Sequence, residues 1–304
     1  MPNVSIIMST YKEDPVLVAT AVDSILNQTY HDLELIVVID CPENNAVQSL
    51  LHKKQQEDGR IIVIHNEHNI GLAASLNKAL GLANGRYICR MDADDISLPS
   101  RIETQLAFLT ERNLDLVGGR MTIIDETGND LYDIPQPPVK PKAVYRALRW
   151  NNCVPHPTWL GKATVFEQAY RMIPLCEDYD FLLRASISGA KIANCDSIVL
   201  KYRMTTESIS RSSLYEQFLY QRYITKAYRH HKVADLQEVN RNVKSSYSEE
   251  KATRYNKANG IFNEVLSALN NRRFLQALMY SFRLLLCSAN YLNKIMRLAL
   301  ATLA

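Results

Sequence analysis

Three carboxylates, Asp92, Asp94 and Asp95, lie within four residues of the chain. The apolar segment 87–89 directly before them is typical of a short buried strand. In α/β proteins, ligands bind beyond the carboxyl ends of such strands. Carboxylates this close repel one another unless a cation lies among them. The run therefore predicts a divalent metal that holds a phosphorylated substrate, and an acidic turn that caps the next helix is the alternative.

A second acidic group, made of Glu177, Asp178 and Asp180, opens another predicted helix. Acidic side chains are favoured at a helix N-terminus by the helix dipole, and from these residues alone that structural explanation is sufficient. The acidic run at 92–95 in the same chain favours a catalytic role for the pair 177–178 instead.

The elements that must position these acids alternate between strand and helix over the first 120 residues. Apolar runs predict buried strands, and apolar residues every three or four positions predict helices. The strands are expected at 4–8, 33–39, 60–64 and 86–90, and the helices at 15–26, 44–57 and 71–83. This order is typical of an α/β fold with a Rossmann-like, mainly parallel sheet and helices on both faces. The loops after the strands should meet at one edge, where a nucleotide could lie.

The loop after the first strand, residues 9–14, carries hydroxyl, aromatic and acidic groups. Such groups can stack on a nucleotide base and accept its hydrogen bonds, although an ordinary polar loop with a helix cap has the same composition. No Gly-x-Gly-x-x-Gly run follows the strand and no Walker A sequence is present. A dinucleotide-binding dehydrogenase and a P-loop NTPase are therefore both disfavoured.

The middle of the chain continues the alternation less regularly. A helix is expected at 100–112 and further strands at 115–124, 191–194 and 197–202. The four prolines of 135–141 predict an extended connection there.

The composition of the 304 residues disfavours several classes of protein. A formal net charge of +3 is too small to indicate a nucleic-acid partner. The six cysteines are scattered and none forms a Cys-x-x-Cys pair, which disfavours a zinc site or a thioredoxin-like motif. We expect a reduced, cytosolic protein, and the first residues lack the basic and cleavable segments of a signal peptide.

Beyond residue 213 the strand patterns give way to helical, basic segments, so we divide the chain into an α/β domain at 1–212 and a helical region at 213–304. No acidic residue follows Glu264, and the later cations stand among Leu, Phe, Met and Tyr. The longest uncharged stretch there is about ten residues, too short to span a bilayer. A basic amphipathic helix can lie on an anionic membrane surface, which is the interpretation we favour. A helix packed on the main domain or in a dimer is the alternative.

Six segments in chain order carry a resemblance to a known family. They are 9–11, 24–30, 39–40, 69–73 with Asn77, 92–95 and 177–178. Together they resemble the motifs of inverting family 2 glycosyltransferases with the GT-A fold, over about residues 3–210. The segment 92–95 looks like the family's DXD motif, and 177–178 looks like its ED motif. The resemblance implies metal-dependent transfer of a sugar from a nucleotide-sugar to a saccharide acceptor, with uridine favoured over guanosine or thymidine.

The DXD resemblance implies roles for the first acidic run. Asp94 is the expected direct ligand of Mg²⁺ or Mn²⁺, Asp92 is expected to contact the ribose or the metal, and Asp95 is expected to be a ligand or to orient the other two. Such an ion neutralises a departing diphosphate as a Lewis acid. The nucleotide contacts that the resemblance implies are Thr10, Tyr11, Glu13, Asp40, Asn69 and Asp92.

The ED resemblance implies that Asp178 is the general base, with Glu177 as its catalytic neighbour. By analogy with glycosidases, a carboxylate on the face opposite the leaving group gives single displacement and inversion. Asp180 is a further candidate contact for the acceptor or the diphosphate.

One departure from the family pattern affects the diphosphate. The family often carries a histidine shortly after a Tyr-Arg pair, and no histidine follows Tyr202-Arg203 here. His156 and Arg203 are therefore candidate diphosphate or acceptor contacts. A histidine that is simply hydrogen-bonded within a proline-rich loop is the alternative for His156.

The longer string 90–101 is similar to bacterial enzymes that assemble O-antigen, capsule or exopolysaccharide repeat units on a lipid diphosphate. This similarity implies a lipid-diphosphate-linked acceptor and a cytoplasmic protein, peripheral on the inner face of the bacterial inner membrane. One alternative is a sugar-phosphate nucleotidyltransferase, which usually needs a glycine-rich, Lys- or Arg-bearing first loop that residues 9–14 do not resemble. Another is a non-catalytic sugar-nucleotide-binding protein, which would be expected to lose these acids.

Overall fold

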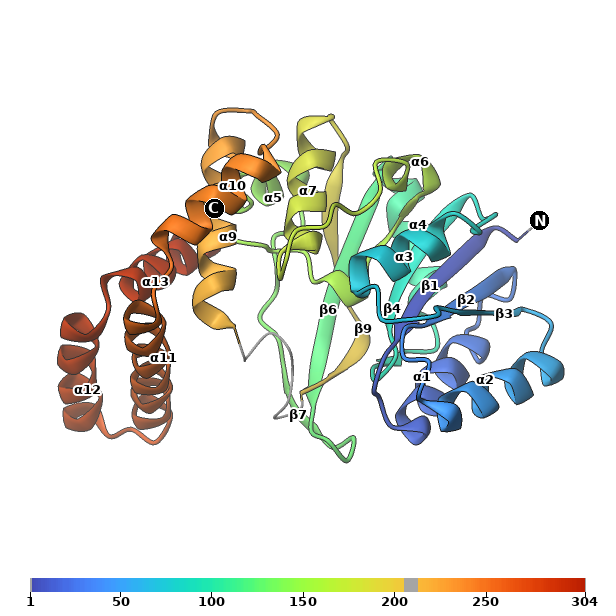
Figure 1. Cartoon of the computed structure of the whole chain (residues 1–304), viewed down its shortest axis with the longest axis horizontal. Helices are drawn as coiled ribbons and strands as arrows, with labels where there is room; N and C mark the ends of the chain where they lie inside the picture. Colours follow the sequence, from blue (N-terminus) through green and yellow to red (C-terminus); the bar gives the residue numbers. More distant parts are fainter. Residues whose placement is uncertain (1, 205–212, 304) are drawn as a thin grey trace.

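A mixed sheet of nine strands organises the computed structural model, which describes residues 2–204 and 213–303 (Figure 1). The strands follow the order β3-β2-β1-β4-β8-β6-β9-β5, and β7 pairs with β6. Their bounds are β1 Val4–Thr10, β2 Leu33–Ile39, β3 Ile61–His65, β4 Tyr87–Asp92, β5 Ile96–Ser97, β6 Leu116–Ile124, β7 Asp130–Asp133, β8 Leu160–Lys162 and β9 Ile192–Arg203.

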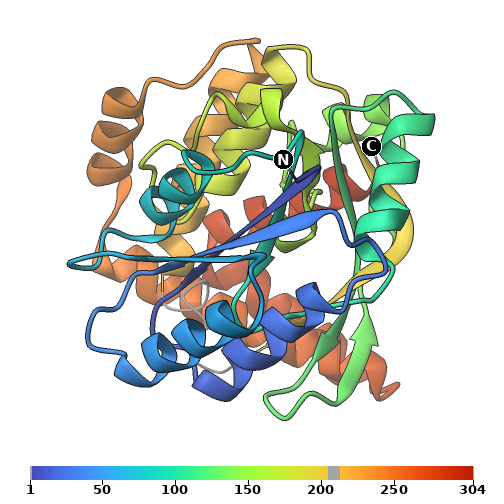
Figure 2. The same cartoon turned by 90° about the vertical axis from the view of Figure 1, so that its right-hand side faces the viewer.

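Helices cover both faces of this sheet (Figures 1 and 2). In the first two thirds of the chain they are α1 Pro15–Leu26, α2 Asn45–Glu57, α3 Leu72–Leu80, α4 Arg101–Glu111, α5 Pro141–Ala147, the 3₁₀ turn η1 His156–Thr158, α6 Ala163–Phe166 and α7 Glu177–Ile187. One hydrophobic core includes α1, α2 and α4, and the other includes α3, α5 and α7. Side chains of β1 and β2 enter both cores alternately, as the two-residue period of a strand requires.

The parallel half of the sheet confirms the alternating strand and helix pattern of the sequence. β1 pairs in parallel with β2 and β4, and β2 pairs in parallel with β3. The register sets Ser9 of β1 opposite Asp92 of β4, and Thr10 opposite Ile39 of β2. The carboxyl ends of these strands therefore lie side by side, and the loops that follow them share one edge of the sheet.

In the other half of the sheet, β8 pairs antiparallel with both β4 and β6, and β6 pairs in parallel with β9. The expectation of two separate strands at 191–194 and 197–202 is wrong, because β9 is continuous from Ile192 to Arg203. The register against β6 shifts between Gly118 and Met121, so the extra residues of β9 around Asp196 are accommodated without ending the strand.

Beyond residue 213 the described chain is helical, as the sequence predicts. The helices are α9 Leu214–Arg229, α10 Leu236–Ser246, α11 Glu249–Asn270, α12 Phe274–Cys287 and α13 Ala289–Thr302. α11 and α12 lie side by side at the end of the molecule farthest from β3 (Figure 1). No helix in the described ranges has the length and apolar composition needed to cross a membrane. The predicted domain boundary at 212 falls outside the described residues.

We expect Gly118→Ala to destabilise the fold where β6, β9 and η1 meet. A Cβ atom at Gly118 would lie 2.4 Å from Asn194 Oδ1 and 2.5 Å from Val154 Cγ1. Overpacking of this kind should lower the free energy of unfolding by about 2 kcal/mol, measured by urea denaturation. Gly81→Ala is the control, because its nearest neighbour would be the Lys78 carbonyl oxygen at 3.5 Å. Equal unfolding midpoints for the two variants would contradict the prediction.

Candidate active site

An open cleft of about 1850 Å³ lies beyond the carboxyl ends of the parallel strands. Most of the site residues that the sequence predicts line it, namely Tyr11, Glu13, Asp40, Asn69, Asp92, Asp94, His156, Glu177 and Asp178. The structure thus brings the DXD-like run of β4 and the acidic start of α7 to one cavity, although 82 residues of sequence separate Asp95 from Asp178. Thr10, Asp95, Asp180 and Arg203 are not part of the lining.

The loop after β1 is held by Glu13. The Thr10 hydroxyl donates a 2.8 Å hydrogen bond to Glu13 Oε2, and the Tyr11 backbone N–H donates one of 2.5 Å to the same oxygen. Thr10 is buried, so its side chain shapes the loop from within. Tyr11 faces the cleft with the Lys12 ammonium 5.0 Å from its ring centroid. The loop therefore offers the cleft an aromatic face and a carboxylate.

Asp40, just beyond β2, holds the loop that leads into α3. Its Oδ1 accepts hydrogen bonds of 2.8 Å from Asn66 Nδ2 and from the Ile70 N–H, and its Oδ2 accepts one of 2.9 Å from the Gly71 N–H. Gly71 has φ +83°, a left-handed conformation that favours glycine. The Asn69 side chain also accepts from the Gly71 N–H, at 2.9 Å. Oδ1 already accepts two hydrogen bonds, but Oδ2 accepts only one, so the carboxylate can still accept one from a ligand in the cleft.

Asp92 and Asp94 present the acidic edge of β4 to the cleft. Asp92 forms an ion pair with the Arg90 guanidinium. Burial, together with the charges of Asp92 and Glu13, raises the pKa of Asp94 to about 7. The negative charge at this edge therefore exceeds what the neighbouring cation compensates.

Asp95 points away from the cleft and supports Asp94 through Arg203. Asp95 is fully buried, and its Oδ1 accepts a 2.8 Å hydrogen bond from the Arg203 backbone N–H. The Arg203 Nε in turn donates to the Asp94 carbonyl oxygen at 2.9 Å, and Nη1 donates to the carbonyls of Asp125 and Glu126. Burial and the charges of Asp92 and Asp94 raise the pKa of Asp95. This placement favours a supporting role for Asp95 and Arg203 over contact with a ligand.

Arg90 is a cleft residue that the sequence reasoning missed. It stands in β4 between Cys89 and Met91, and only 2% of its surface is exposed. Burial disfavours its charged form, but the Asp92 carboxylate outweighs that effect and raises the pKa of Arg90. A guanidinium in an otherwise apolar buried strand is costly without an anionic partner. An arginine between apolar residues of a predicted buried strand is therefore the sequence feature that could have indicated a nearby anion.

Glu177 and Asp178, in the first turn of α7, form a second acidic wall of the cleft. Asp178 Oδ2 accepts a 2.8 Å hydrogen bond from Asn152 Nδ2, and Oδ1 accepts one of 2.7 Å from the Tyr179 N–H. Burial raises the pKa of Asp178. Burial and the neighbouring Asp178 charge raise the pKa of Glu177 to about 7. Asn152, which fixes the orientation of Asp178, is a second residue that the sequence reasoning missed.

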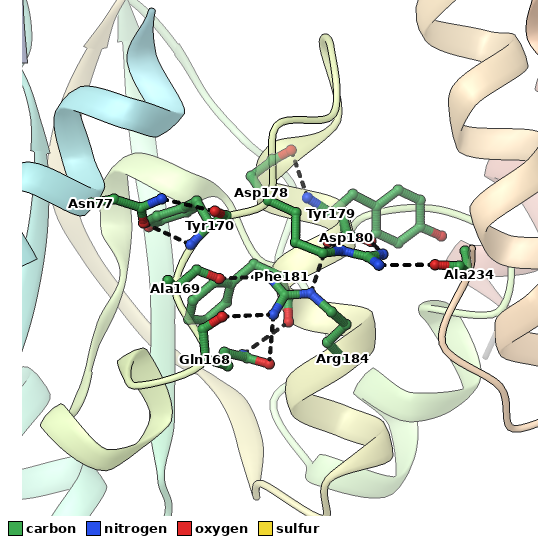
Figure 3. A network of polar contacts seen from close by, with 11 residues as sticks. Asn77, Gln168, Ala169, Tyr170, Asp178, Tyr179, Asp180, Phe181, Arg184 and Ala234 are labelled. Atoms are coloured by element: carbon green, nitrogen blue, oxygen red, sulfur yellow. Dashed lines mark hydrogen bonds and ion pairs between the residues drawn. The ribbon is translucent and has the colours of Figure 1, made fainter. Parts of the chain in front are cut away.

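Asp180 lies beneath this pair and is fully engaged by cations. Only 2% of Asp180 is exposed, and it pairs with Arg171 and with Arg184. Figure 3 shows Arg184 between Asp180 and the backbone carbonyls of Gln168 and Ala169, to which it donates. The Asp180 carboxylate thus anchors the start of α7, and the structure does not place it against the cleft.

His156 reaches the cleft from η1 but is largely buried. A 2.9 Å hydrogen bond joins its Nε2 to the Tyr170 hydroxyl, and its ring meets Trp159 edge to face at 4.5 Å between centroids. Burial and the nearby Arg90 charge lower the pKa of His156 well below its ordinary value. His156 is therefore a neutral residue of the cleft wall whose Nε2 is engaged by Tyr170.

The far end of the cleft is apolar and includes the C-terminal helix. The loop 172–175 contributes Met172, Ile173, Pro174 and Leu175, and α13 contributes Leu298, Ala301 and Thr302. No local pattern predicts this contribution, because more than 100 residues of sequence separate Asp178 from the part of α13 that lines the cleft. The cleft thus has an acidic part beside the sheet and an apolar part beside α13.

The carboxylates of the cleft suit a divalent cation such as Mg²⁺, which takes part of its ligands from water and substrate phosphates. They do not form a site in which protein side chains alone surround a metal. Among the described residues, no three His, Cys, Asp or Glu side chains converge into a group that could hold a metal. Mg²⁺ is often bound by one or two carboxylates and completed by water and substrate phosphates. Asp94 and Asp92 line the cleft as such a pair, and a cation bound beside them would compensate their negative charges.

Comparison with known proteins assigns this architecture to a family. The family model described as glycosyl transferase family 2 matches residues 5–168. The O-antigen biosynthesis glycosyltransferase WbnJ of Escherichia coli is 32% identical over 216 residues, which cover 69% of this chain and 83% of WbnJ. The E. coli UDP-Glc:alpha-D-GlcNAc-diphosphoundecaprenol beta-1,3-glucosyltransferase WfgD is 30% identical over 221 residues, covering 70% and 81% of the two chains.

A solved structure supports the fold. The S. aureus TarS fragment 1–349, crystallised with UDP-GlcNAc, superposes with a TM-score of 0.62 at 18% identity. The match covers 80% of this chain and 70% of the TarS fragment. At that identity the likeness establishes the shared GT-A architecture, which confirms the predicted fold class.

We expect Glu177→Gln to raise the melting temperature at pH 8 but not at pH 4. The pKa of Glu177 is about 7 in the folded protein and about 4.3 in an unfolded chain. Between these values the folded state binds more protons, so stability falls as pH rises from about 4 to about 7. Removing the charge should therefore raise the melting temperature by roughly 2 °C or more at pH 8.

Asp58→Asn is the control for this pH dependence. The hydrogen bond from Arg60 holds the pKa of Asp58 below its ordinary value, so its charge stabilises the fold. That substitution should lower the melting temperature at pH 8 or leave it unchanged. An equal gain for Glu177→Gln at pH 4 and pH 8 would show that charge is not the cause.

Proposed function

The chain belongs to glycosyl transferase family 2, and from this premise we propose that it moves a sugar from a nucleotide-sugar, with inversion, to a saccharide carried on a lipid diphosphate. Membership of that family removes the nucleotidyltransferase and the non-catalytic binding protein as alternatives. The observation that carries the proposal is that two acidic pairs, Asp92 with Asp94 and Glu177 with Asp178, line the same cleft.

The donor is proposed to lie along the carboxyl edge of β1, β2 and β4. Tyr11 offers a ring for stacking on the base, and the Asp40 carboxylate and the loop 69–71 offer polar contacts to the base and ribose. Uridine is the favoured base, in keeping with the UDP-glucose in the name of WfgD. Asp94, with Asp92, would hold Mg²⁺ or Mn²⁺. When bound, such an ion neutralises the diphosphate and stabilises the charge that develops on it as it leaves.

Asp178 is proposed to be the general base. It takes the proton from the acceptor hydroxyl while that oxygen bonds to the anomeric carbon and the bond from that carbon to the diphosphate oxygen breaks. Burial raises the pKa of Asp178, which makes its carboxylate a better proton acceptor. The hydrogen bond from Asn152 fixes its orientation. One displacement on the face opposite the leaving group inverts the configuration of the anomeric carbon.

The acceptor is proposed from the names of two relatives and the shape of the cleft. WbnJ is named for O-antigen biosynthesis and WfgD for a diphosphoundecaprenol acceptor. The apolar end of the cleft, between the loop 172–175 and α13, leaves room for an acceptor beyond Asp178. Such an acceptor would place the enzyme at the inner face of a bacterial inner membrane as a peripheral protein. A panel of nucleotide-sugars with Mn²⁺ or Mg²⁺ and lipid-diphosphate-linked sugars tests the reaction.

We expect Asp178→Asn to lower the rate of sugar transfer by roughly 10³-fold, because an amide cannot accept the acceptor's proton. Donor affinity, measured by isothermal titration calorimetry, should change by less than about twofold, since Asp178 is proposed to act on the acceptor. Asp196→Asn is the matched control, because that side chain is 66% exposed and lies on β9 outside the cleft lining. Transfer by Asp178→Asn at the wild-type rate would remove Asp178 from the base role.

We expect Asp94→Asn to abolish the effect of metal on donor binding. In the wild type, adding Mn²⁺ to metal-free protein should tighten binding of a UDP-sugar by roughly tenfold or more, because an ion held by Asp94 and Asp92 would neutralise the diphosphate. In the Asp94→Asn variant the affinity should be weak with or without Mn²⁺, while Asp196→Asn behaves like the wild type. A full response to Mn²⁺ in Asp94→Asn would show that this carboxylate is not a ligand.

A further inference from the structure

α12 presents an apolar face to solvent. Leu275, Leu278 and Leu286 are 85%, 70% and 75% exposed. The other large apolar side chains exposed on the same helix are Phe274, Met279, Phe282 and Leu285. Most of these residues recur at separations of three, four or seven, so they share one side of the helix. Exposed apolar areas of this extent mark interaction sites in soluble proteins.

The opposite side of α12 packs against the rest of the molecule. Ala277 and Leu284 are buried, and α12 packs along α11. In Figure 1, α12 forms the outer edge of the molecule at the end away from β3, with α11 between it and α9. The exposed leucines therefore contribute little to the described fold, and their hydrophobicity calls for another explanation.

The charges around this face distinguish an anionic bilayer from a second copy of the chain. Arg272, Arg273 and Arg283 are exposed at the start and flank of α12. The acid closest to them along the chain is Glu264, 4.0 Å from Arg283, and no acidic residue follows it in the sequence. Two apposed copies of this face would bring arginines together with little acid to compensate them. An anionic leaflet accepts the leucines and neutralises the arginines together.

We propose that the face of α12 formed by residues 274–286 is a docking surface for an anionic lipid bilayer, with its leucines and phenylalanines inserted among the acyl chains and Arg272, Arg273 and Arg283 at the headgroups.

This docking surface is connected directly to the cleft. Only Ser288 separates α12 from α13, and its hydroxyl caps α13 by accepting a hydrogen bond from the Tyr291 N–H at 3.3 Å. α13 is about 20 Å long, and its last turns reach the cleft lining. Docking by α12 thus sets the apolar end of the cleft roughly one helix length from the bilayer. Binding to lipid stands by itself, and delivery of a lipid-linked acceptor along this path rests on the proposed function.

The test is flotation of the full-length protein with vesicles of phosphatidylethanolamine and phosphatidylglycerol, compared with vesicles of phosphatidylcholine. We expect the wild type to float with the anionic vesicles. The double variant Leu275→Gln and Leu286→Gln should bind them about tenfold more weakly or worse, because two inserted side chains are lost. The matched control is Leu82→Gln with Leu131→Gln, two leucines that are 47% and 53% exposed on the α/β part of the chain. That control should bind like the wild type.

A second variant separates charge from insertion. Replacing Arg272, Arg273 and Arg283 by Gln should weaken binding to the anionic vesicles by roughly fivefold for each arginine and change binding to phosphatidylcholine little. Unchanged melting temperatures would show that both α12 variants are folded.

Three results would overturn the proposal. The first is wild-type protein that does not float with anionic vesicles, and the second is an α12 leucine variant that floats as well as the wild type. The third is a wild-type dimer in light scattering that becomes a monomer in the leucine variant without any vesicle binding, which would assign the face to a second copy. None of these measurements uses a nucleotide-sugar, so failure here leaves the proposed transfer reaction to its own tests.

Discussion

The buried guanidinium of Arg90 is the interaction on which the arrangement of the cleft depends. It pairs with Asp92, and its charge also lowers the pKa values of Asp94, Asp95, Glu177 and Asp178 against the opposing effect of burial. Arg90 can occupy the middle of a sheet because its strand is held on both sides. Its N–H donates to the Trp159 carbonyl at 2.9 Å, and its own carbonyl accepts from Arg101 at 2.7 Å. The charge of this one cation thus acts on both acidic pairs, while backbone contacts hold the strand that carries it.

The charge of Arg90 compensates the cleft carboxylates only in part, and this has a chemical consequence. The pKa values of Asp94 and Glu177 remain near 7 even with Arg90 beside them. A site adapted only for stability would have neutralised or removed these acids, since raised carboxyl pKa values weaken the folded state at neutral pH. Surplus negative charge is instead useful if a cation and a proton arrive with the substrates. The first acidic wall suits the cation and the second suits the proton.

Sequence reasoning identified which residues follow strand ends but could not determine which way each side chain points. The parallel half of the fold was predictable because its strands are apolar and its loops polar. Asp180 illustrates the limit. It is two residues from Asp178, which in a helix is a rotation of about 200°, so the two carboxylates face opposite sides. Asp180 accordingly binds Arg171 and Arg184 beneath the cleft. The position of Arg203 after Tyr202 predicts a ligand contact but does not reveal that its guanidinium donates to the backbone carbonyls of Asp94 and Asp125.

The part of the site that no local pattern could reveal is the contribution of the C-terminal helices. Arg297 of α13 is buried and donates to the Thr225 hydroxyl of α9 at 2.9 Å. α9 packs on α7, whose first turn carries Glu177 and Asp178. The same helical layer therefore supports the proposed base, lines the apolar end of the cleft and carries the exposed face of α12. This series of contacts links the proposed docking surface on α12 to the helix that carries Asp178. On the proposed function, an acceptor anchored in the bilayer would have to span the distance from α12 to Asp178, so the length of its diphosphate and sugars would contribute to its recognition.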